Sequence, residues 1–333
     1  MASDRVTMED VAARAGVSRA LVSIVFRGVA GASDATRERV LAAARELDYR
    51  PDTRASRLGR SRTRMVGVTF SVGATFHGDL IQSLYTHADA AGYEVVLSGV
   101  TPERTEAAAI ETLLAERCEA IVVLGSTLSA GHLLRLASQL PVVSVLRGVT
   151  GDVDVVRTDD AEGLRLAVDH LVALGHQRIA LLDGGQAPGG AERRRGYRAG
   201  LRRAGGHPEL VLTGGLTELD GASAATEFLA LGRGRPTAVA AFNDRCALGF
   251  IDVVRQAGLR VPHDVSVVGF DDITQAAYPH VSLTTVCQDA EQLGAAAVRT
   301  VDARLSGAAP GRATVIEPEL VVRTSTAPPP SDG

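Results

Sequence analysis

The stretch TMEDVAARAGVSRALVSIVFR, residues 7–27, decides how the N-terminal part of this chain folds. Thr7 and Asp10 have the spacing of a capping box, in which two side chains satisfy free amides at the start of a helix. Gly16 can adopt the left-handed conformation that a tight turn between helices requires. Ser18 can cap a second helix. The pattern therefore predicts two short helices joined by a tight turn.

Apolar residues recur at helical spacing along these segments and predict a small shared core. In the first two helices they are Val11, Ala12, Ala15, Val22, Val25 and Phe26. A third helix is predicted over residues 34–48, capped by Ser33. Its core-facing residues are expected to be Ala35, Val40, Ala43, Ala44 and Leu47.

The outer face of the second helix begins with Arg19, Ala20 and Ser23, followed by Ile24. In a helix-turn-helix, the early residues of this helix reach base edges in the major groove. Arg19 could donate two hydrogen bonds to a guanine, and Ala20 or Ile24 could contact a thymine methyl. A generic helical hairpin is the alternative interpretation. The N-terminal position, the positive charge and the complete motif favour DNA binding.

The charge of the chain is divided unevenly along its length. Residues 1–64 hold 13 arginines and 8 acidic residues, a net charge of +5. The remaining residues hold 22 arginines and 31 acidic residues, a net charge of −9, which together give the overall −4. A basic head on an acidic body suggests that only the head meets a polyanion such as double-stranded DNA.

The bulk composition is that of a soluble globular protein, with 45% hydrophobic and 22% charged residues among 333. We find no apolar run long enough for a membrane span and no export signal at the N-terminus. The 3 cysteines are far apart and suggest neither a disulfide framework nor a metal site. We therefore expect a cytoplasmic protein, associated with the nucleoid, that needs no cofactor or metal.

From residue 65 onward the pattern changes to strands alternating with helices. Val- and Ile-rich runs are typical of strands buried on both faces, and their alternation with helices predicts an α/β fold with doubly wound parallel sheets. The apolar runs are 65–70, 94–97, 120–124, 141–146, 178–182, 238–242 and 265–270. The intervening helical patterns are 78–91, 103–116, 130–138, 160–174, 190–204, 221–231 and 244–257.

The length of this α/β region favours two lobes facing a cleft over a single sheet. Ligands of such folds bind at the carboxyl ends of the strands. Asn243, Asp244 and Asp271 each follow an apolar run directly, and so does Arg147. Arg193 begins a helix after another run. Such groups can bracket a polyol with paired hydrogen bonds. The alternatives are that Asp244 only caps the next helix and that Asp271 forms a loop ion pair.

Residues 6–58 resemble the head of the lactose-repressor (LacI/GalR) family, an all-α helix-turn-helix domain. The similarity continues through the body, where the strongest markers are HLVALGHQRIA at 170–180, FND at 242–244 and DVSVVGFDD at 264–272. Leu21 stands where the family usually has Thr, and Ile24 stands where it often has a base-reading Arg. These departures affect the expected operator sequence.

The resemblance implies a two-lobed body like that of periplasmic binding proteins. The domains expected are a head at 1–50, a hinge linker at 51–64 and a disordered tail at 327–333. The first lobe would comprise 65–160 and 290–322, and the second lobe 161–289 and 323–326. In the linker, Ala55 would contact a second copy and Leu58 would wedge into the minor groove. A flexible tether is the alternative for this segment.

The family match also supplies the predicted site residues. The DNA-contacting residues would be Thr7, Ser18, Arg19, Ala20, Ser23, Ile24, Arg27, Arg54, Ala55 and Leu58. The effector-contacting residues would be Phe76, Arg147, Arg193, Asn243, Asp271 and Gln288. A sugar or sugar derivative is the expected effector. With no Trp in the chain, stacking on it would rely on Phe76, Tyr197, Phe242 or Tyr278.

The sequence thus predicts a transcription regulator, a repressor that binds operator DNA as a homodimer and responds to a small molecule. A tetramer is not expected, because no leucine heptads follow Arg323. Two other classes of protein fit this sequence less well. A solute-binding receptor would have an export signal and no basic head. An α/β enzyme would need a phosphate-cradling Gly loop, and the Gly pairs at 184–185 and 189–190 do not match that spacing.

Overall fold

The computed structural model describes residues 6–26, 28–49 and 62–330. Two units separate within it, a head up to Thr63 and a body from Arg64 onward. In the described part of the head, the helices are α1 (Met8–Ala15), α2 (Arg19–Phe26) and α3 (Asp34–Glu46).

The predicted helix starts of the head and the turn at Gly16 are confirmed, whereas α3 ends at Glu46 and not at the predicted residue 48. Thr7 and Asp10 form the capping box of α1, and Gly16 ends that helix in the left-handed region with φ of +64°. The hydroxyl of Ser18 accepts a hydrogen bond from the amide of Leu21, in the first turn of α2, at 3.2 Å. Ser33 caps α3 in the same way. Local side-chain chemistry therefore fixes where each helix of the head begins.

The core of the head joins the three helices. Val11, Val22 and Val40 are fully buried at its centre. One predicted core residue is wrong, because Ala35 is exposed. Five residues separate it from Val40, so at 100° per residue its side chain lies about 140° away around the helix, on the solvent side.

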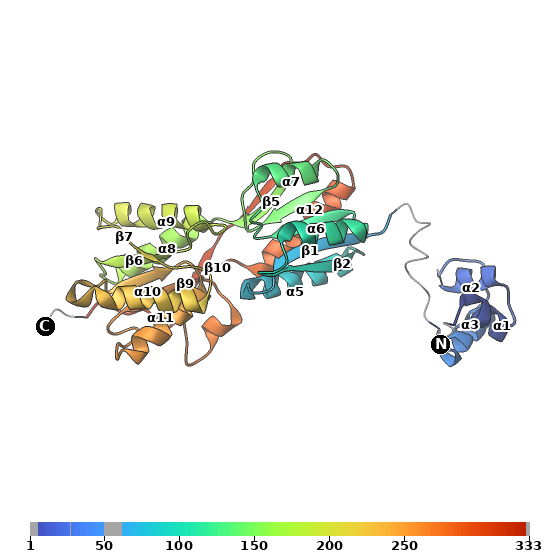
Figure 1. Cartoon of the computed structure of the whole chain (residues 1–333), viewed down its shortest axis with the longest axis horizontal. Helices are drawn as coiled ribbons and strands as arrows, with labels where there is room; N and C mark the ends of the chain where they lie inside the picture. Colours follow the sequence, from blue (N-terminus) through green and yellow to red (C-terminus); the bar gives the residue numbers. More distant parts are fainter. Residues whose placement is uncertain (1–5, 27, 50–61, 331–333) are drawn as a thin grey trace. The chain divides into compact units, whose positions relative to one another are not determined.

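The first lobe of the body is a parallel sheet in the order β11-β5-β4-β3-β1-β2. Its residues alternate between two helical layers (Figure 1): Val66 and Val68 pack under α5 and α12, and Met65 packs under α6 and α7. The elements are β1 (Met65–Ser71), α5 (Thr75–Ala90), β2 (Glu94–Val100), α6 (Glu106–Ala115), β3 (Ala120–Leu124), α7 (Ala130–Ala137), β4 (Val142–Val145), β5 (Asp154–Thr158), α12 (Ala290–Leu305) and β11 (Ala313–Ile316).

The second lobe repeats this plan in the order β12-β10-β9-β8-β6-β7, with only β12 antiparallel to its neighbour among the described strands. Leu181 packs under α8 and α9, whereas Leu182 packs under α10 and α11. The elements are α8 (Asp160–Ala173), β6 (Ile179–Asp183), α9 (Gly190–Arg203), β7 (Leu210–Thr213), α10 (Glu218–Ala230), β8 (Ala238–Ala241), α11 (Asp244–Gln256), β9 (Ser266–Asp271), β10 (Thr284–Cys287) and β12 (Glu319–Val321), with short 3₁₀ turns at Gly232–Gly234 and Thr274–Ala277.

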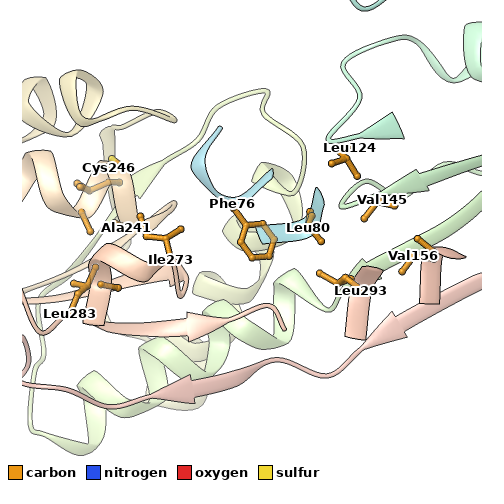
Figure 2. Packing of buried hydrophobic residues seen from close by; sticks show 14 of the residues in the cluster. Phe76, Leu80, Leu124, Val145, Val156, Ala241, Cys246, Ile273, Leu283 and Leu293 are labelled. Carbon is orange, nitrogen blue, oxygen red and sulfur yellow. The ribbon is translucent and has the colours of Figure 1, made fainter. Parts of the chain in front are cut away.

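The buried residues of the two lobes meet in one continuous cluster. Figure 2 shows Phe76 of α5 between Leu80 of the first lobe and Ile273 of the second. The chain passes between the lobes after β5, after β10 and after β11. Thr158, at the first of these crossings, donates from its hydroxyl to the carbonyl of Gln288 at the second. These connections place the carboxyl ends of the strands in one sheet next to the carboxyl ends of the strands in the other.

Two predicted boundaries differ from the structure. Residues 319–322 were assigned to the first lobe, but β12 pairs with β10 in the second sheet, so the third crossing comes before Glu319. The segment from Ala327 was expected to be disordered. Instead, the Ala327 carbonyl accepts hydrogen bonds from His176 and Ser266. Buried polar groups of the second lobe therefore hold the chain to at least this point.

Among the residues that the structure describes, no helix combines the length and the apolar character needed to cross a membrane.

Candidate functional site

The head presents the early residues of α2 to solvent. Ser18, Arg19 and Ala20 are exposed, and Ser23 and Ile24 are half-buried on the same helix. Their position follows from the buried face of α2, since Val22 and Val25 turn inward and leave these neighbours outside. The predicted base-reading residues of α2 thus share one accessible surface at the start of a capped helix.

Arg19 and Thr7 are among the predicted DNA-contacting residues whose side chains already have partners within the head. The Arg19 guanidinium lies 3.0 Å from the Glu9 carboxylate in an exposed ion pair. The Thr7 hydroxyl donates to Asp10 at 2.8 Å, and hydrogen bonds from Thr7 lower the pKa of that carboxyl. Exposed pairs of this kind contribute little energy, so Arg19 can exchange Glu9 for another acceptor. Arg27, Arg54, Ala55 and Leu58 lie outside the described residues.

A cavity of about 290 Å³ lies between the lobes of the body. Its walls come from segments that directly follow strands: residues 71–77 after β1, 125–127 after β3, 242–243 after β8, 271–273 after β9, and Gln288 after β10. This is where ligands of open α/β sheets bind. Of the predicted effector residues, the cavity brings together Phe76, Arg193, Asn243, Asp271 and Gln288.

Arg193 is the best-anchored charged side chain of the cavity. Its side chain is 7% exposed, and its Nε donates to Asp160 at 2.9 Å. Its Nη1 donates to the carbonyl of Phe242 at 2.5 Å. The guanidinium also stacks over the Phe270 ring at 3.6 Å from its centre. An arginine held this firmly offers a fixed group to a ligand, with little freedom left to lose on binding.

Asp271 and Gln288 form a hydrogen-bonded pair beside Arg193. The Gln288 amide donates to the Asp271 carboxylate at 2.7 Å, and Arg193 Nη2 lies 3.7 Å from the same oxygen. Burial raises the pKa of Asp271 to about 6, against the opposing effect of Arg193. The backbone at Asp271 has φ of +115°, unusual for a residue with a side chain. Strained residues of this kind gather at ligand sites.

Asn243 lines the cavity as predicted and also takes the capping role that was suggested for Asp244. The helix cap of α11 is Asn243, whose Oδ1 accepts the amide of Cys246 at 2.9 Å. Asp244 is fully buried and accepts from the Ile273 amide and from the Thr285 hydroxyl. Burial raises its pKa well above the usual range. The interpretation of Asp244 as a cap was therefore wrong, and its side chain instead ties together segments behind the cavity.

Arg147 does not line this cavity. It lines a neighbouring one of about 230 Å³, together with Arg157 and Asp160. Its Nη1 donates to the carbonyls of Ser126 and Leu128, which ties it to the loop after β3.

Of the aromatic residues predicted to stack on the effector, only some line the cavity. Phe76 and Phe242 line the cavity between the lobes, whereas Tyr197 and Tyr278 do not. Tyr197 is fully buried, and its hydroxyl donates to the carbonyls of Ile179 and Leu210. It is a core residue of the second lobe.

Two cavity residues carry ionisable side chains that the sequence predictions did not assign. His77 lies next to Phe76, and Arg245 follows Asn243 and Asp244 directly. Arg245 pairs with Glu218 and also donates to the carbonyl of Gly73 in the first lobe. Each of the two residues stands next to, or two positions from, a predicted site residue in the sequence, and this position could have identified it as a cavity residue. Among the described residues, no cluster of His, Cys, Asp and Glu could hold a metal ion.

Comparisons with known proteins agree with this division into head and body. Residues 7–52 match the family described as bacterial regulatory proteins, lacI family. Residues 168–326 match the periplasmic binding protein-like domain. The regulator DegA of Bacillus subtilis is 32% identical over 97% of this chain and 99% of its own length. The regulator GalR of Escherichia coli is 35% identical over 84% of this chain and 83% of its own length.

Solved structures extend the similarity to three dimensions. The lac repressor dimer bound to operator and the anti-inducer ONPF has a TM-score of 0.83 and 30% identity, over 97% of this chain and 100% of that one. A Rhodococcus LacI transcriptional regulator has a TM-score of 0.77 and 44% identity, over 80% of this chain and 100% of that one. The complex of the regulator CelR with cellobiose has a TM-score of 0.72 and 32% identity, over 96% of this chain and 100% of that one.

Proposed function

Because the chain belongs to the lacI family of bacterial regulatory proteins, we propose that it represses transcription from a specific operator and that a small molecule controls its affinity for that operator. The observation that carries the proposal is the combination, in one chain, of a capped helix-turn-helix with a body whose strands end around a shared cavity. The head recognises DNA, and the body senses the effector. We expect no catalytic turnover and a location in the cytoplasm.

The DNA contacts are assigned to the exposed part of α2. Arg19 and Ala20 meet base edges in the major groove, with Ser23 and Ile24 one turn further along. Thr7 and Ser18, at the starts of α1 and α2, are expected to approach the phosphate backbone, where helix N-termini favour anions. The linker residues Arg54, Ala55 and Leu58, together with Arg27, remain predicted contacts.

The effector is assigned to the cavity between the lobes and is expected to be a sugar or sugar derivative. Arg193, Asp271 and Gln288 offer donors and acceptors within one hydrogen-bonded group, as recognition of a polyol requires. The solved relative CelR holds cellobiose, which supports this class of ligand. Arg147 can take part only through the neighbouring cavity.

The experiment that tests the proposal is a DNA-binding titration at one fixed salt concentration. Fluorescence anisotropy would compare duplexes that flank the protein's own gene with a random duplex of equal length. We expect specific binding at least about a thousandfold tighter than non-specific binding. Equal affinity for every duplex, with and without candidate sugars, would refute the proposal.

A further inference from the structure

The charged side chains that line the cavity are already neutralised by the protein. Within residues 62–330 the lining contains Arg193, Arg245 and Asp271 as ionisable groups besides one histidine. Arg193 is paired with Asp160 and lies near Asp271. Arg245 is paired with Glu218. A phosphate or carboxylate ligand would compete with these carboxylates for the two guanidinium groups, and displacement of Asp160, which is 4% exposed, would leave a buried carboxylate uncompensated.

His77 is the remaining ionisable group of the lining. It lies in the first turn of α5 and is 7% exposed. Its Nδ1 accepts a hydrogen bond from the Ser71 amide at 3.1 Å. In a neutral imidazole one nitrogen accepts and the other carries the proton, so this contact assigns the proton to Nε2. Burial lowers the pKa of His77 to about 4, which keeps the ring neutral at pH 7.

The protonated nitrogen has room in front of it. Gly125, which lines the same cavity, has φ of +55°, and a Cβ at that position would lie 3.2 Å from His77 Nε2. Glycine therefore leaves this edge of the ring open. Within residues 62–330, the hydrogen bond from Ser71 is the one that the His77 ring forms, so Nε2–H has no protein acceptor there. Among the described residues, Nε2 is not one of the fully buried polar atoms that lack a partner, so it is accessible from the cavity, where water or a ligand can accept its hydrogen bond.

We propose that His77 is a specificity-determining residue of the effector site: a fixed, neutral Nε2–H donor that selects an uncharged ligand presenting an oxygen acceptor to the first-lobe wall. A hydroxyl, a ring oxygen or a carbonyl of an unphosphorylated sugar fits this requirement. The proposal rests on the effector site of the proposed function and adds two statements to it. The ligand carries no net charge, and one of its oxygens bonds to His77.

The first test uses full-length protein and a defined set of compounds. Thermal shift and titration calorimetry would compare D-glucose, D-galactose, D-ribose and cellobiose with glucose 6-phosphate, ribose 5-phosphate and gluconate. We expect at least one uncharged sugar to bind and its charged counterpart to bind at least about tenfold more weakly. Preference for a charged compound would overturn the assignment. Binding of no compound would overturn the assigned class as well, whereas operator binding of the same samples decides the proposed function separately.

The second test changes the donor itself. His77→Phe keeps a flat ring of similar size without the donor, and His77→Gln places an amide N–H near the position of Nε2. We expect the Kd of the bound sugar to rise by about tenfold or more in His77→Phe and by less than about threefold in His77→Gln. His132→Phe, at a half-buried position on α7 outside the cavity lining, is the matched control and should bind like the wild type. Unchanged affinity in His77→Phe would overturn the proposal.

A third measurement needs no ligand. Nitrogen-15 NMR of the histidine rings distinguishes the two neutral tautomers, and the His77→Gln variant identifies the signal of His77. We expect the Nε2–H tautomer at pH 7. Observation of the Nδ1–H tautomer, or of a charged ring, would overturn the proposal even if a sugar binds.

Discussion

Arg19 is the residue of α2 best suited to read a base, and its ion pair with Glu9 is weak. The ion pair with Glu9 is exposed on both sides, with side-chain exposures of 68% and 61%. We therefore predict that Arg19→Ala weakens binding to the specific operator by roughly 1–3 kcal/mol, or about 5- to 150-fold. Fluorescence anisotropy at fixed salt measures this change.

The matched control for Arg19 is Arg14, which is also exposed and also paired, with Glu46 on α3. Arg14 lies in the last turn of α1 and is not one of the predicted DNA-contacting residues. Arg14→Ala should weaken specific and random duplexes equally, since it changes only the positive charge of the head. If Arg19→Ala also affected both duplexes equally, Arg19 would contact only phosphate.

Asp271 should make folding less favourable as the pH rises. Its pKa is raised by burial to about 6 in the folded protein, against a usual value of 3.8. Between these two values the unfolded chain releases the proton that the folded chain retains. The stabilising contribution is therefore present below pH 4 and is lost as the pH rises through about 6. The upper limit of this loss is about 3 kcal/mol, at 1.36 kcal/mol per pKa unit.

The variant Asp271→Asn removes this titration. Relative to the wild type, its free energy of unfolding should be larger, meaning a more stable protein, at pH 7 than at pH 4.5, as measured by urea unfolding at both pH values. Asp264→Asn is the control, because pairing with Arg260 lowers the pKa of Asp264 to about 2. Its difference from the wild type should stay constant over this range. The same constancy for Asp271→Asn would contradict the prediction.

Residue roles near a strand end were harder to predict than residue positions. The sequence indicated that Asn243, Asp244 and Asp271 follow strands, and Asn243 and Asp271 do line the cavity. It did not reveal which of Asn243 and Asp244 caps α11. Glycine at position 269 leaves space for the buried side chain of Asp244, because a Cβ on residue 269 would lie 2.0 Å from the Asp244 carboxylate. Such a contact joins the start of α11 to β9, and no local spacing encodes it.

The helix pairs of the second lobe approach each other through glycines. A Cβ on Gly249 of α11 would lie 1.9 Å from the Glu218 carbonyl of α10, and a Cβ on Gly221 of α10 would lie 2.0 Å from the Cys246 carbonyl. We predict that Gly249→Ala destabilises the body by roughly 1–3 kcal/mol or more, because two backbones must separate. Urea unfolding measures this loss. Gly234→Ala, where a Cβ meets open space, should stay within about 0.5 kcal/mol of the wild type.

The elements that sequence reasoning located share a strong and continuous pattern. β3, with the sequence AIVVL, is buried at every position and was predicted at its observed bounds. The strands that were missed lack such a run. β5 carries Asp154 and Arg157, and the last strand, β12, has only 3 residues. Their pairing depends on neighbours far along the chain, which periodicity within a short window cannot detect.

At the scale of the whole molecule, the chain length and the repeated strand-helix pattern predict two lobes. They do not predict where the chain passes between the lobes for the third time. β11 and β12 are separated by two residues, yet they belong to different sheets. β11 continues the first sheet beside β5, and β12 pairs with β10. A connection this short resembles a hairpin in sequence. Only the tertiary pairing shows that it passes between lobes.

Apolar side chains remain exposed on both lobes of the body and are expected to meet a second copy of the chain. Leu219 at the start of α10 is 82% exposed, and Tyr85 of α5 and Leu97 of the edge strand β2 are 45% and 38% exposed. Large apolar side chains that are exposed on a protein surface are candidates for association surfaces. A two-fold dimer also matches the symmetry of an operator with two half-sites.

We therefore predict that Leu219→Glu shifts the monomer–dimer equilibrium toward the monomer by at least about tenfold, since it places two like charges in an apolar contact. Sedimentation equilibrium at micromolar concentration measures the shift. Operator affinity should fall in parallel, because a monomer engages one half-site only. Val322→Glu, a change at a 58% exposed position in the same lobe, is the matched control and should leave both quantities unchanged. A Leu219→Glu variant that stays dimeric while Tyr85→Glu dissociates would place the contact on the first lobe instead.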